Sequence, residues 1–157
     1  MKITLILVGK TDDDYLIKGI DIYEQRIKHY LSFEKIIIPA LKNTHALSVE
    51  QQKQKEGELI LKNIQTADKF ILLDEKGKEY GSVEFSAFIQ QQMNSGIKNC
   101  VFAIGGPYGF SDEVYKRAQA KLSLSKMTFS HQMVRLFFVE QLYRGMTILR
   151  NEPYHHQ

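Results

Sequence analysis

The stretch VFAIGGPYGFSDE, residues 101–113, passes from an apolar run through a glycine-rich turn into residues that typically begin a helix. The run 101–104 predicts a buried strand. Ser111, followed by two acidic residues, predicts the cap and first turn of a helix. Glycines let the backbone approach a ligand closely, and the N–H groups at a helix start bind polar ligand atoms. The stretch therefore predicts a strand–loop–helix unit, whose turn either binds a ligand or is purely structural.

Two common nucleotide-binding motifs do not fit this stretch. Pro107 and Tyr108 break the spacing of a GxGxxG fingerprint, and no Gly-Lys-Ser or Gly-Lys-Thr follows as in a Walker loop. Ligands of parallel α/β sheets nevertheless tend to bind at the carboxyl ends of strands. A second strand end is predicted at 70–73, followed by a turn at 76–78. Between them, Asp74 either contacts a ligand or simply ends the strand, and we favour the second interpretation.

The same alternation of apolar strands and amphipathic helices extends along the chain. Strands are predicted at 3–8, 34–39, 70–73, 101–104 and 122–124. Helices are predicted after Asp12–Asp14, after Ser48, from Ser82 or Ser86 to Met93, after Ser111, and from His131 to Leu149. Alternating elements of this kind predict one α/β domain over residues 1–157, with a mostly parallel sheet flanked by helices.

Composition narrows the class of protein. The net charge is +3, and residues 111–157 hold all of the excess, with 7 Lys and Arg against 4 Asp and Glu. A basic C-terminal third suits a polyanionic partner, although a chance imbalance on a solvated face explains it equally well. The single cysteine, Cys100, excludes an internal disulfide and a cysteine-rich zinc site, and no apolar run is long enough to span a membrane. We therefore expect a cytoplasmic protein.

The last predicted helix is apolar on every side. A small domain cannot bury such a helix completely, so a second subunit is the simplest cover and a homodimer is predicted. The helix follows a segment, 122–132, in which small polar residues alternate with apolar ones. Thr128 or Ser130 is its predicted cap, and a strand–cap–helix junction would by itself explain the segment.

Charged and aromatic residues near the C-terminus are candidates for RNA contacts. Arg135 and Arg144 interrupt the apolar helix, and arginines beside a pocket either bind an anion such as RNA phosphate or form structural ion pairs. The tail carries Tyr154, His155 and His156. Adjacent histidines seldom point at one ion, and no HExxH motif or second cluster accompanies them, so no metal site is expected.

Four motifs in this region together resemble one family. They are LSKMTF at 124–129, HQMVR at 131–135, EQLYR at 140–144 and PYH at 153–155. The combination is similar to the ribosomal RNA large subunit methyltransferase H family, SPOUT-class enzymes that methylate N3 of a pseudouridine in large-subunit (23S) ribosomal RNA. The similarity extends upstream to Ile104-Gly105-Gly106, to Leu73 and to the opening residues 1–10.

The resemblance implies a fold, a cofactor and a set of partners. The fold would be SPOUT, with a C-terminal trefoil knot that ordinary topology rules would argue against. The protein would be a homodimer that uses S-adenosyl-L-methionine to modify large-subunit ribosomal RNA, and so small a domain should need the assembled ribosome to present its target. The implied cofactor contacts are Leu73, Gly105, Leu124, Ser125, Lys126, Met127, Thr128 and Phe129.

Methyl transfer to N3 requires an imide nitrogen that loses its proton while it lies in line with the methyl group. The candidates near the acceptor are His131, Arg135, Arg144, Tyr154 and His155. We assign Tyr154 and His155 to placement of the base, and Arg135 or Arg144 to an RNA phosphate or an imide oxygen. The competing hypothesis is a non-catalytic dimeric α/β module that binds RNA or a nucleotide. The lack of a carboxylate–histidine cluster disfavours a metal-dependent hydrolase.

Overall fold

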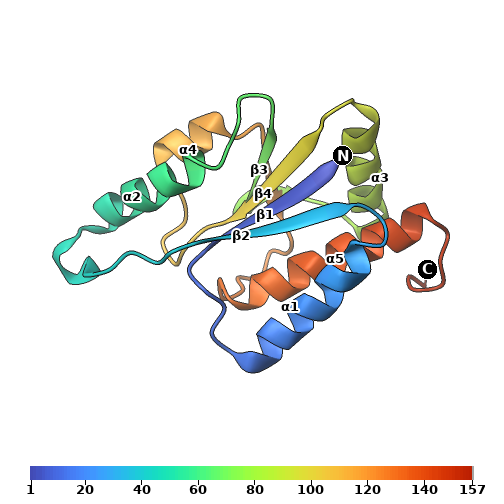
Figure 1. Cartoon of the computed structure of the whole chain (residues 1–157), viewed down its shortest axis with the longest axis horizontal. Helices are drawn as coiled ribbons and strands as arrows, with labels where there is room; N and C mark the ends of the chain where they lie inside the picture. Colours follow the sequence, from blue (N-terminus) through green and yellow to red (C-terminus); the bar gives the residue numbers. More distant parts are fainter. Residues whose placement is uncertain (157) are drawn as a thin grey trace.

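A computed structural model of the chain describes residues 1–156, which form one parallel sheet with helices on both faces (Figure 1). The strands are β1 (Lys2–Val8), β2 (Ser32–Ile38), β3 (Lys69–Glu79), β4 (Asn99–Ile104) and β5 (Ala120–Ser123). The helices are α1 (Asp14–Ile27), α2 (Val49–Leu61), α3 (Ser82–Asn94), α4 (Asp112–Arg117) and α5 (Met133–Leu149), with a short 3-10 helix, η1 (Thr44–Ala46). The predicted α/β architecture with a parallel sheet is confirmed.

The strand order across the sheet is β2-β1-β4-β3-β5, with every neighbouring pair parallel. β4 lies at the centre, and its pairing with β1 runs from Lys2 opposite Asn99 to Leu7 opposite Ile104. The central strands read as continuous apolar runs because both faces of the sheet are covered. The carboxyl ends of β3, β4 and β5 consequently lie side by side.

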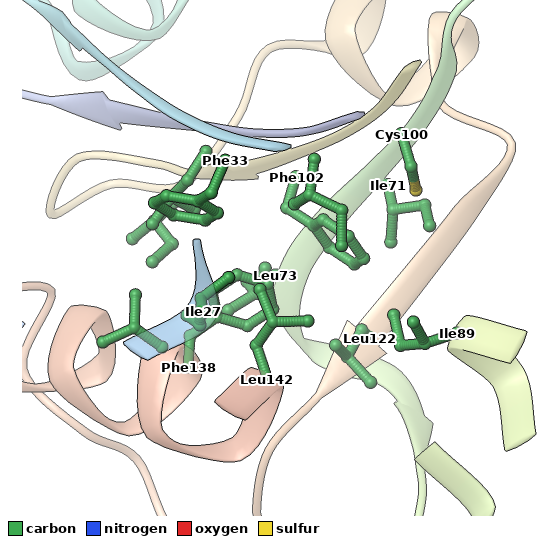
Figure 2. Close-up of a cluster of buried hydrophobic side chains, with 14 of the residues drawn as sticks. Ile27, Phe33, Ile71, Leu73, Ile89, Cys100, Phe102, Leu122, Phe138 and Leu142 are labelled. Carbon is green, nitrogen blue, oxygen red and sulfur yellow. The ribbon is translucent and has the colours of Figure 1, made fainter. Parts of the chain in front are cut away.

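Two hydrophobic cores separate the sheet from its helices. On one face α1, α3 and α5 pack, and Figure 2 shows Phe102 of β4 facing Phe138 of α5, with ring centroids 4.9 Å apart. On the other face Ile60 of α2 and Val114 of α4 cover a second cluster. Burial of such side chains contributes roughly 1.5–3 kcal/mol each before the entropy cost, so the two cores fix the sheet and the loops at its edge.

Helix α5 lies between α1 and α3 across the sheet (Figure 1). It can approach both closely because small residues face it: Leu136 packs on Gly19 of α1, and Gly145 lies against Ser86 of α3. Phe137 remains 38% exposed on its outer side. Burial of this helix on every side is therefore incomplete within one chain.

The predicted turn at 76–78 is wrong. Strand β3 does not stop at Leu73 but continues to Glu79, and it pairs with β5 again at Lys78 and Glu79 after an irregularity in register. Gly77 lies within this irregularity, where a Cβ would come within 2.5 Å of the Leu122 backbone. Glycine here therefore permits close approach between strands, a long-range contact that local sequence signals do not report.

The helix caps were predicted more accurately than the turn at 76–78. The Ser48 side chain accepts a hydrogen bond from the Gln51 N–H, and the Gln51 side chain returns one from the Ser48 N–H, which forms a capping box. Ser111 caps α4 as predicted. α5 begins at Met133 rather than His131, and Ser130 accepts a hydrogen bond from the Met133 N–H at 3.1 Å. β5 ends at Ser123, which leaves Leu124 in the following loop.

Within residues 1–156, no helix combines the length and the apolar character that a membrane crossing requires.

Candidate functional site

A cavity of about 670 Å³ lies where the carboxyl ends of β4 and β5 meet the irregularity in β3 after Leu73. Its walls are formed by residues 73–76 at the bend of β3, 104–110 after β4, 122–125 and 127–131 from β5 onward, together with Lys53, Tyr115 and Val134. We call residues 105–109 the glycine loop and residues 124–129 the serine loop. Seven of the eight predicted cofactor residues line the cavity, namely Leu73, Gly105, Leu124, Ser125, Met127, Thr128 and Phe129. Lys126 lies in the serine loop but is exposed and does not line the cavity.

The glycine loop owes its shape to two positions that side chains would disturb. Gly109 has φ +80°, and Gly106 and Gly109 form an isolated bridge that closes the turn. A Cβ on Gly105 would lie 3.2 Å from both the Gly109 carbonyl oxygen and the Phe110 ring. At its three glycines the loop therefore presents bare backbone to the cavity, which lets a ligand approach closely, while Pro107 and Tyr108 also line the wall.

The serine loop is held by short hydrogen bonds of its own. The Ser123 hydroxyl donates to the Ser125 carbonyl at 2.9 Å, and the Met127 N–H donates to the Ser125 hydroxyl at 2.9 Å. Met127 is 75% exposed at the mouth of the cavity, whereas Phe129 packs on Phe137 of α5 with centroids 4.8 Å apart. The loop is thus anchored at both ends and open in its middle.

Asp74 has a structural role in this arrangement. One of its oxygens accepts a hydrogen bond from the Lys76 N–H at 2.8 Å and the other from the Tyr115 hydroxyl at 2.5 Å. Burial first, and then the bond to Asp74, raises the pKa of the Tyr115 hydroxyl, so it remains a donor at neutral pH. Both carboxylate oxygens are engaged within the chain, in line with the structural interpretation of Asp74.

Arg135 lies in the interior, away from any position that RNA could reach. Its side chain is fully buried, and its guanidinium donates to the carbonyls of Val8 at 2.7 Å, Gly9 at 3.1 Å and His131 at 3.0 Å, and to the Thr11 hydroxyl at 3.0 Å. A contact with phosphate would break these bonds. Arg135 therefore ties the start of α5 to the end of β1, and the predicted contact with an RNA phosphate or imide oxygen does not fit its position.

His131 belongs to the cavity wall. Partial burial, and then the positive charge of Arg135, lower the pKa of its imidazole, while Asp12 opposes the shift. His131 is therefore held in its neutral form, and its side chain can hydrogen-bond to a ligand without adding charge to the cavity.

The other three residues predicted to lie near the methyl-accepting base are Arg144, Tyr154 and His155. They come together beside the C-terminal half of α5. Glu140 binds both Arg144, with Oε1 to Nη2 at 2.5 Å, and the Tyr154 hydroxyl at 2.9 Å. Arg144 also stacks over the Tyr154 ring at 4.7 Å and lies 3.4 Å from His155 Nδ1. We call Glu140, Arg144, Tyr154 and His155 the C-terminal cluster.

Aromatic residues attach this cluster to the body of the protein. The Tyr154 ring packs on Tyr143 of α5 with centroids 4.7 Å apart, and its hydroxyl lies 3.2 Å from that of Tyr23 on α1. Glu152 accepts a hydrogen bond from Tyr30. The tail is thus docked, which the sequence left open. The i,i+4 spacing of Glu140 and Arg144 indicates their ion pair in the sequence, whereas the bond from Tyr154 to Glu140 appears only in the structure.

Within one chain the cavity and the C-terminal cluster do not meet. Val134 of α5 lines the cavity, and Arg144 follows ten residues later, which at 1.5 Å per residue is roughly 15 Å along the helix. Figure 1 shows the C-terminal tail on the same side of the view as the N-terminus, away from the carboxyl ends of the strands. A site containing both needs a contribution from another chain.

A parallel α/β fold with a backbone-lined cavity at its strand ends is typical of proteins that bind a nucleotide-like ligand. The chain matches the family model described as "Predicted SPOUT methyltransferase" over residues 1–155. Two curated relatives are each named ribosomal RNA large subunit methyltransferase H, from Christiangramia forsetii at 61% identity and from Flavobacterium johnsoniae at 62%. Both alignments cover all of both chains. The chain therefore belongs to the SPOUT methyltransferase family, and within it to the ribosomal RNA large subunit methyltransferase H family.

A solved structure supports the fold alone. The structure described as "a probable methylase family protein from Haemophilus influenzae Rd KW20" matches with a TM-score of 0.53 at 13% sequence identity. The match covers 95% of this chain and 66% of that one.

Proposed function

We propose that this enzyme uses S-adenosyl-L-methionine to methylate N3 of a pseudouridine in large-subunit (23S) ribosomal RNA. The observation that carries the proposal is the cavity, because the predicted cofactor residues come from three separate segments of the chain and converge on it. The relatives' names supply the substrate class. The modified position, N3 of pseudouridine, comes from the motif resemblance.

The cavity suits the proposed cofactor in size and in chemistry. Its volume of about 670 Å³ falls within the usual range for small-molecule sites of roughly 300–1,000 Å³. Gly105 leaves room for close approach, and the glycine and serine loops offer backbone donors and acceptors to the adenosyl group. Leu73, Leu124 and Phe129 add apolar walls. The bound cofactor would supply an electrophilic methyl group on a sulfonium.

The catalytic unit is proposed to be a homodimer. The C-terminal cluster of one chain lies too far from that chain's own cavity to act there, so it would complete the cavity of its partner. The face around α5 supports this arrangement, since Phe137 is exposed there and Tyr15 and Ile22 are exposed on the neighbouring α1. Apolar side chains of this kind are what a dimer interface covers.

In this arrangement the residues of the C-terminal cluster act on the acceptor base. Arg144, held by Glu140, would present positive charge to an imide oxygen or an RNA phosphate and so favour loss of the N3 proton. Tyr154 and His155 would place the base and receive or relay that proton. Most of the rate acceleration would come from orientation of the nitrogen in line with the methyl group.

The remaining proposals concern topology and setting. A C-terminal trefoil knot is proposed, supported by the path of the chain after β5: Gln132 donates to the Lys10 carbonyl, and Arg135 reaches Val8, so this segment crosses the ends of β3 and β4. The substrate is proposed to be the assembled ribosome in a reducing cytoplasm. No group of metal-binding side chains occurs within residues 1–156.

The test combines binding and transfer. Calorimetry should detect S-adenosyl-L-methionine binding at micromolar to millimolar concentration. Labelled cofactor should transfer its methyl group to ribosomes that lack their own methylation, and mass spectrometry should identify N3-methylpseudouridine. No binding at millimolar cofactor would favour the non-catalytic RNA-binding module, whereas transfer to a different nucleotide would refute the pseudouridine assignment alone.

A further inference from the structure

The buried carboxyl group of Glu56 lies directly behind the glycine loop. Glu56 is in the middle of α2 and only 5% exposed, whereas Glu58 on the same helix is exposed. Its Oε1 accepts one hydrogen bond, from Gln52 Nε2 at 3.3 Å, and no ion pair to it is present within residues 1–156. Burial raises the pKa of this carboxyl, opposed by the Gln52 bond. Burying an acidic group with so little pairing costs stability, which calls for a compensating role.

The glycine loop is built around this carboxyl group. A Cβ on Gly106 would lie 2.8 Å from Glu56 Oε2 and 3.3 Å from Oε1, so the carboxyl occupies the space where another side chain would begin. The next residue of α2, Gly57, contacts Ser111 equally closely, because a Cβ there would lie 2.4 Å from the Ser111 hydroxyl. Two consecutive residues of α2 therefore press against the glycine loop and the cap of the helix that follows it.

We propose that Glu56 is a positioning residue for the ligand cavity. Its carboxyl group braces the backbone of Gly106, and through Gly106 it sets the position of Gly105 in the cavity wall. Glu56 itself does not line the cavity. Its effect should therefore appear in the order of the loop and in ligand affinity, and not in the chemical step. The affinity part of this inference rests on the proposed cofactor, whereas the loop-ordering part does not.

Amide hydrogen exchange on the full-length protein tests the loop-ordering part. In Glu56→Ala the amides of residues 105–109 should exchange about tenfold faster than in the wild type, because the loop loses its brace. Glu56→Gln keeps the shape of the side chain and should stay near wild type, and Glu58→Ala is the matched control. Unchanged exchange in the loop, or equal acceleration throughout α2, α4 and the sheet, would overturn the proposal. If Glu56→Ala does not fold, Glu56→Asp replaces it, with a smaller acceleration expected.

A double-mutant cycle tests the contact itself. Gly106→Ala should weaken S-adenosyl-L-methionine binding about tenfold in the wild type, because the new Cβ meets the Glu56 carboxyl. In the Glu56→Ala background the same substitution should cost much less, since the space is free. Strictly additive losses would show that the two residues do not interact.

Kinetics separates positioning from chemistry. Glu56→Ala should raise the cofactor Kd about tenfold while the single-turnover rate at saturating cofactor changes less than about twofold. An equal loss in both would assign Glu56 to the chemical step and contradict the proposal. A wild-type protein that binds no cofactor would refute the proposed function, and the exchange experiment would still decide the role of Glu56.

Discussion

Two arginines on α5 show how burial separates residues that look equivalent in the sequence. Arg135 has four acceptors within its own chain and no exposed surface, whereas Arg144 is partly exposed and held by Glu140 at 2.5 Å. An exposed guanidinium can bind phosphate or an imide oxygen, whereas a fully buried one held by four acceptors would have to break those bonds to do so. The difference assigns Arg135 to stability and leaves Arg144 available for substrate.

Substitution of Arg135 tests this division. Arg135→Met keeps the volume but leaves the carbonyls of Val8 and Gly9 without their donor, and it should lower the free energy of unfolding by about 2–4 kcal/mol. Urea denaturation monitored by circular dichroism measures the loss. Arg144→Met is the matched control, expected to change stability by less than about 1 kcal/mol while it strongly reduces methyl transfer. Equal stability of the two variants would contradict the assignment.

His131 should make cofactor binding depend on pH. Its lowered pKa keeps the imidazole neutral above the ordinary value of 6.5, and protonation at lower pH would place a positive charge beside a cationic cofactor. Affinity measured by calorimetry should therefore be constant above pH 6.5 and fall as the pH drops through the lowered pKa.

The contribution of His131 to the free energy of unfolding should depend on pH in the same direction as the cofactor affinity. The unfolded chain takes up its proton first, so the contribution is fully present above pH 6.5 and is lost as the pH falls toward the folded pKa. His131→Gln should flatten the acid side of the affinity profile. An unchanged profile in that variant would assign the pH dependence to another group.

At the scale of elements, α5 connects the cavity to the C-terminal cluster. Its start joins the cavity through His131 and Val134, and its end carries Arg144 and the docked tail. Because Glu140 holds both Arg144 and Tyr154, the order of the tail depends on one carboxylate as well as on the aromatic contacts.

Removal of the tail should separate cofactor binding from catalysis. A chain ending at Asn151 loses Tyr154 and His155 but keeps every cavity residue. Its S-adenosyl-L-methionine affinity should stay within about twofold of wild type, whereas single-turnover methylation of ribosomes should be abolished. Loss of cofactor binding in this variant would place the tail in the folding of the cavity, and full activity would remove Tyr154 and His155 from the mechanism.

At the scale of the whole molecule, the separation of cavity and cluster supports the proposal that two chains share each site. The separation follows from the positions of Val134 and Arg144 along α5 and from the position of the tail away from the carboxyl ends of the strands (Figure 1). The proposed homodimer would then complete each site in addition to covering Phe137.

Mixed dimers test the shared site. Gly105→Val should block the cavity, and the chain ending at Asn151 lacks Tyr154 and His155 of the C-terminal cluster, so each variant alone should be inactive. Subunits mixed in equal amounts should recover about a quarter of the wild-type sites, because half of the dimers are mixed and each contains one intact pair. Sedimentation confirms that the dimers form, and no recovery despite mixed dimers would refute sharing between chains.

Local signals in the sequence were sufficient for several features. The caps at Ser48 and Ser111, the buried strands and the glycine loop follow from residues close together in the chain. The prediction of a turn at 76–78 was wrong because Gly77 packs against the backbone of Leu122, which lies 45 residues away in the chain. Propensity and periodicity describe neighbours along the chain and contain no information about such a contact.

The sequence by itself determined the α/β class, the parallel sheet, the family and most of the cavity wall, because short motifs or hydrophobic periodicity predict each of them. Only the tertiary structure decided that Arg135 is a buried tie to β1 and that Glu140 organises the tail. It also placed Glu56 behind the glycine loop, and it placed Arg144, Tyr154 and His155 away from the cavity of their own chain. The physical reason is that burial and distance depend on how remote segments pack, and these two quantities determine whether a polar side chain stabilises the fold or faces a ligand.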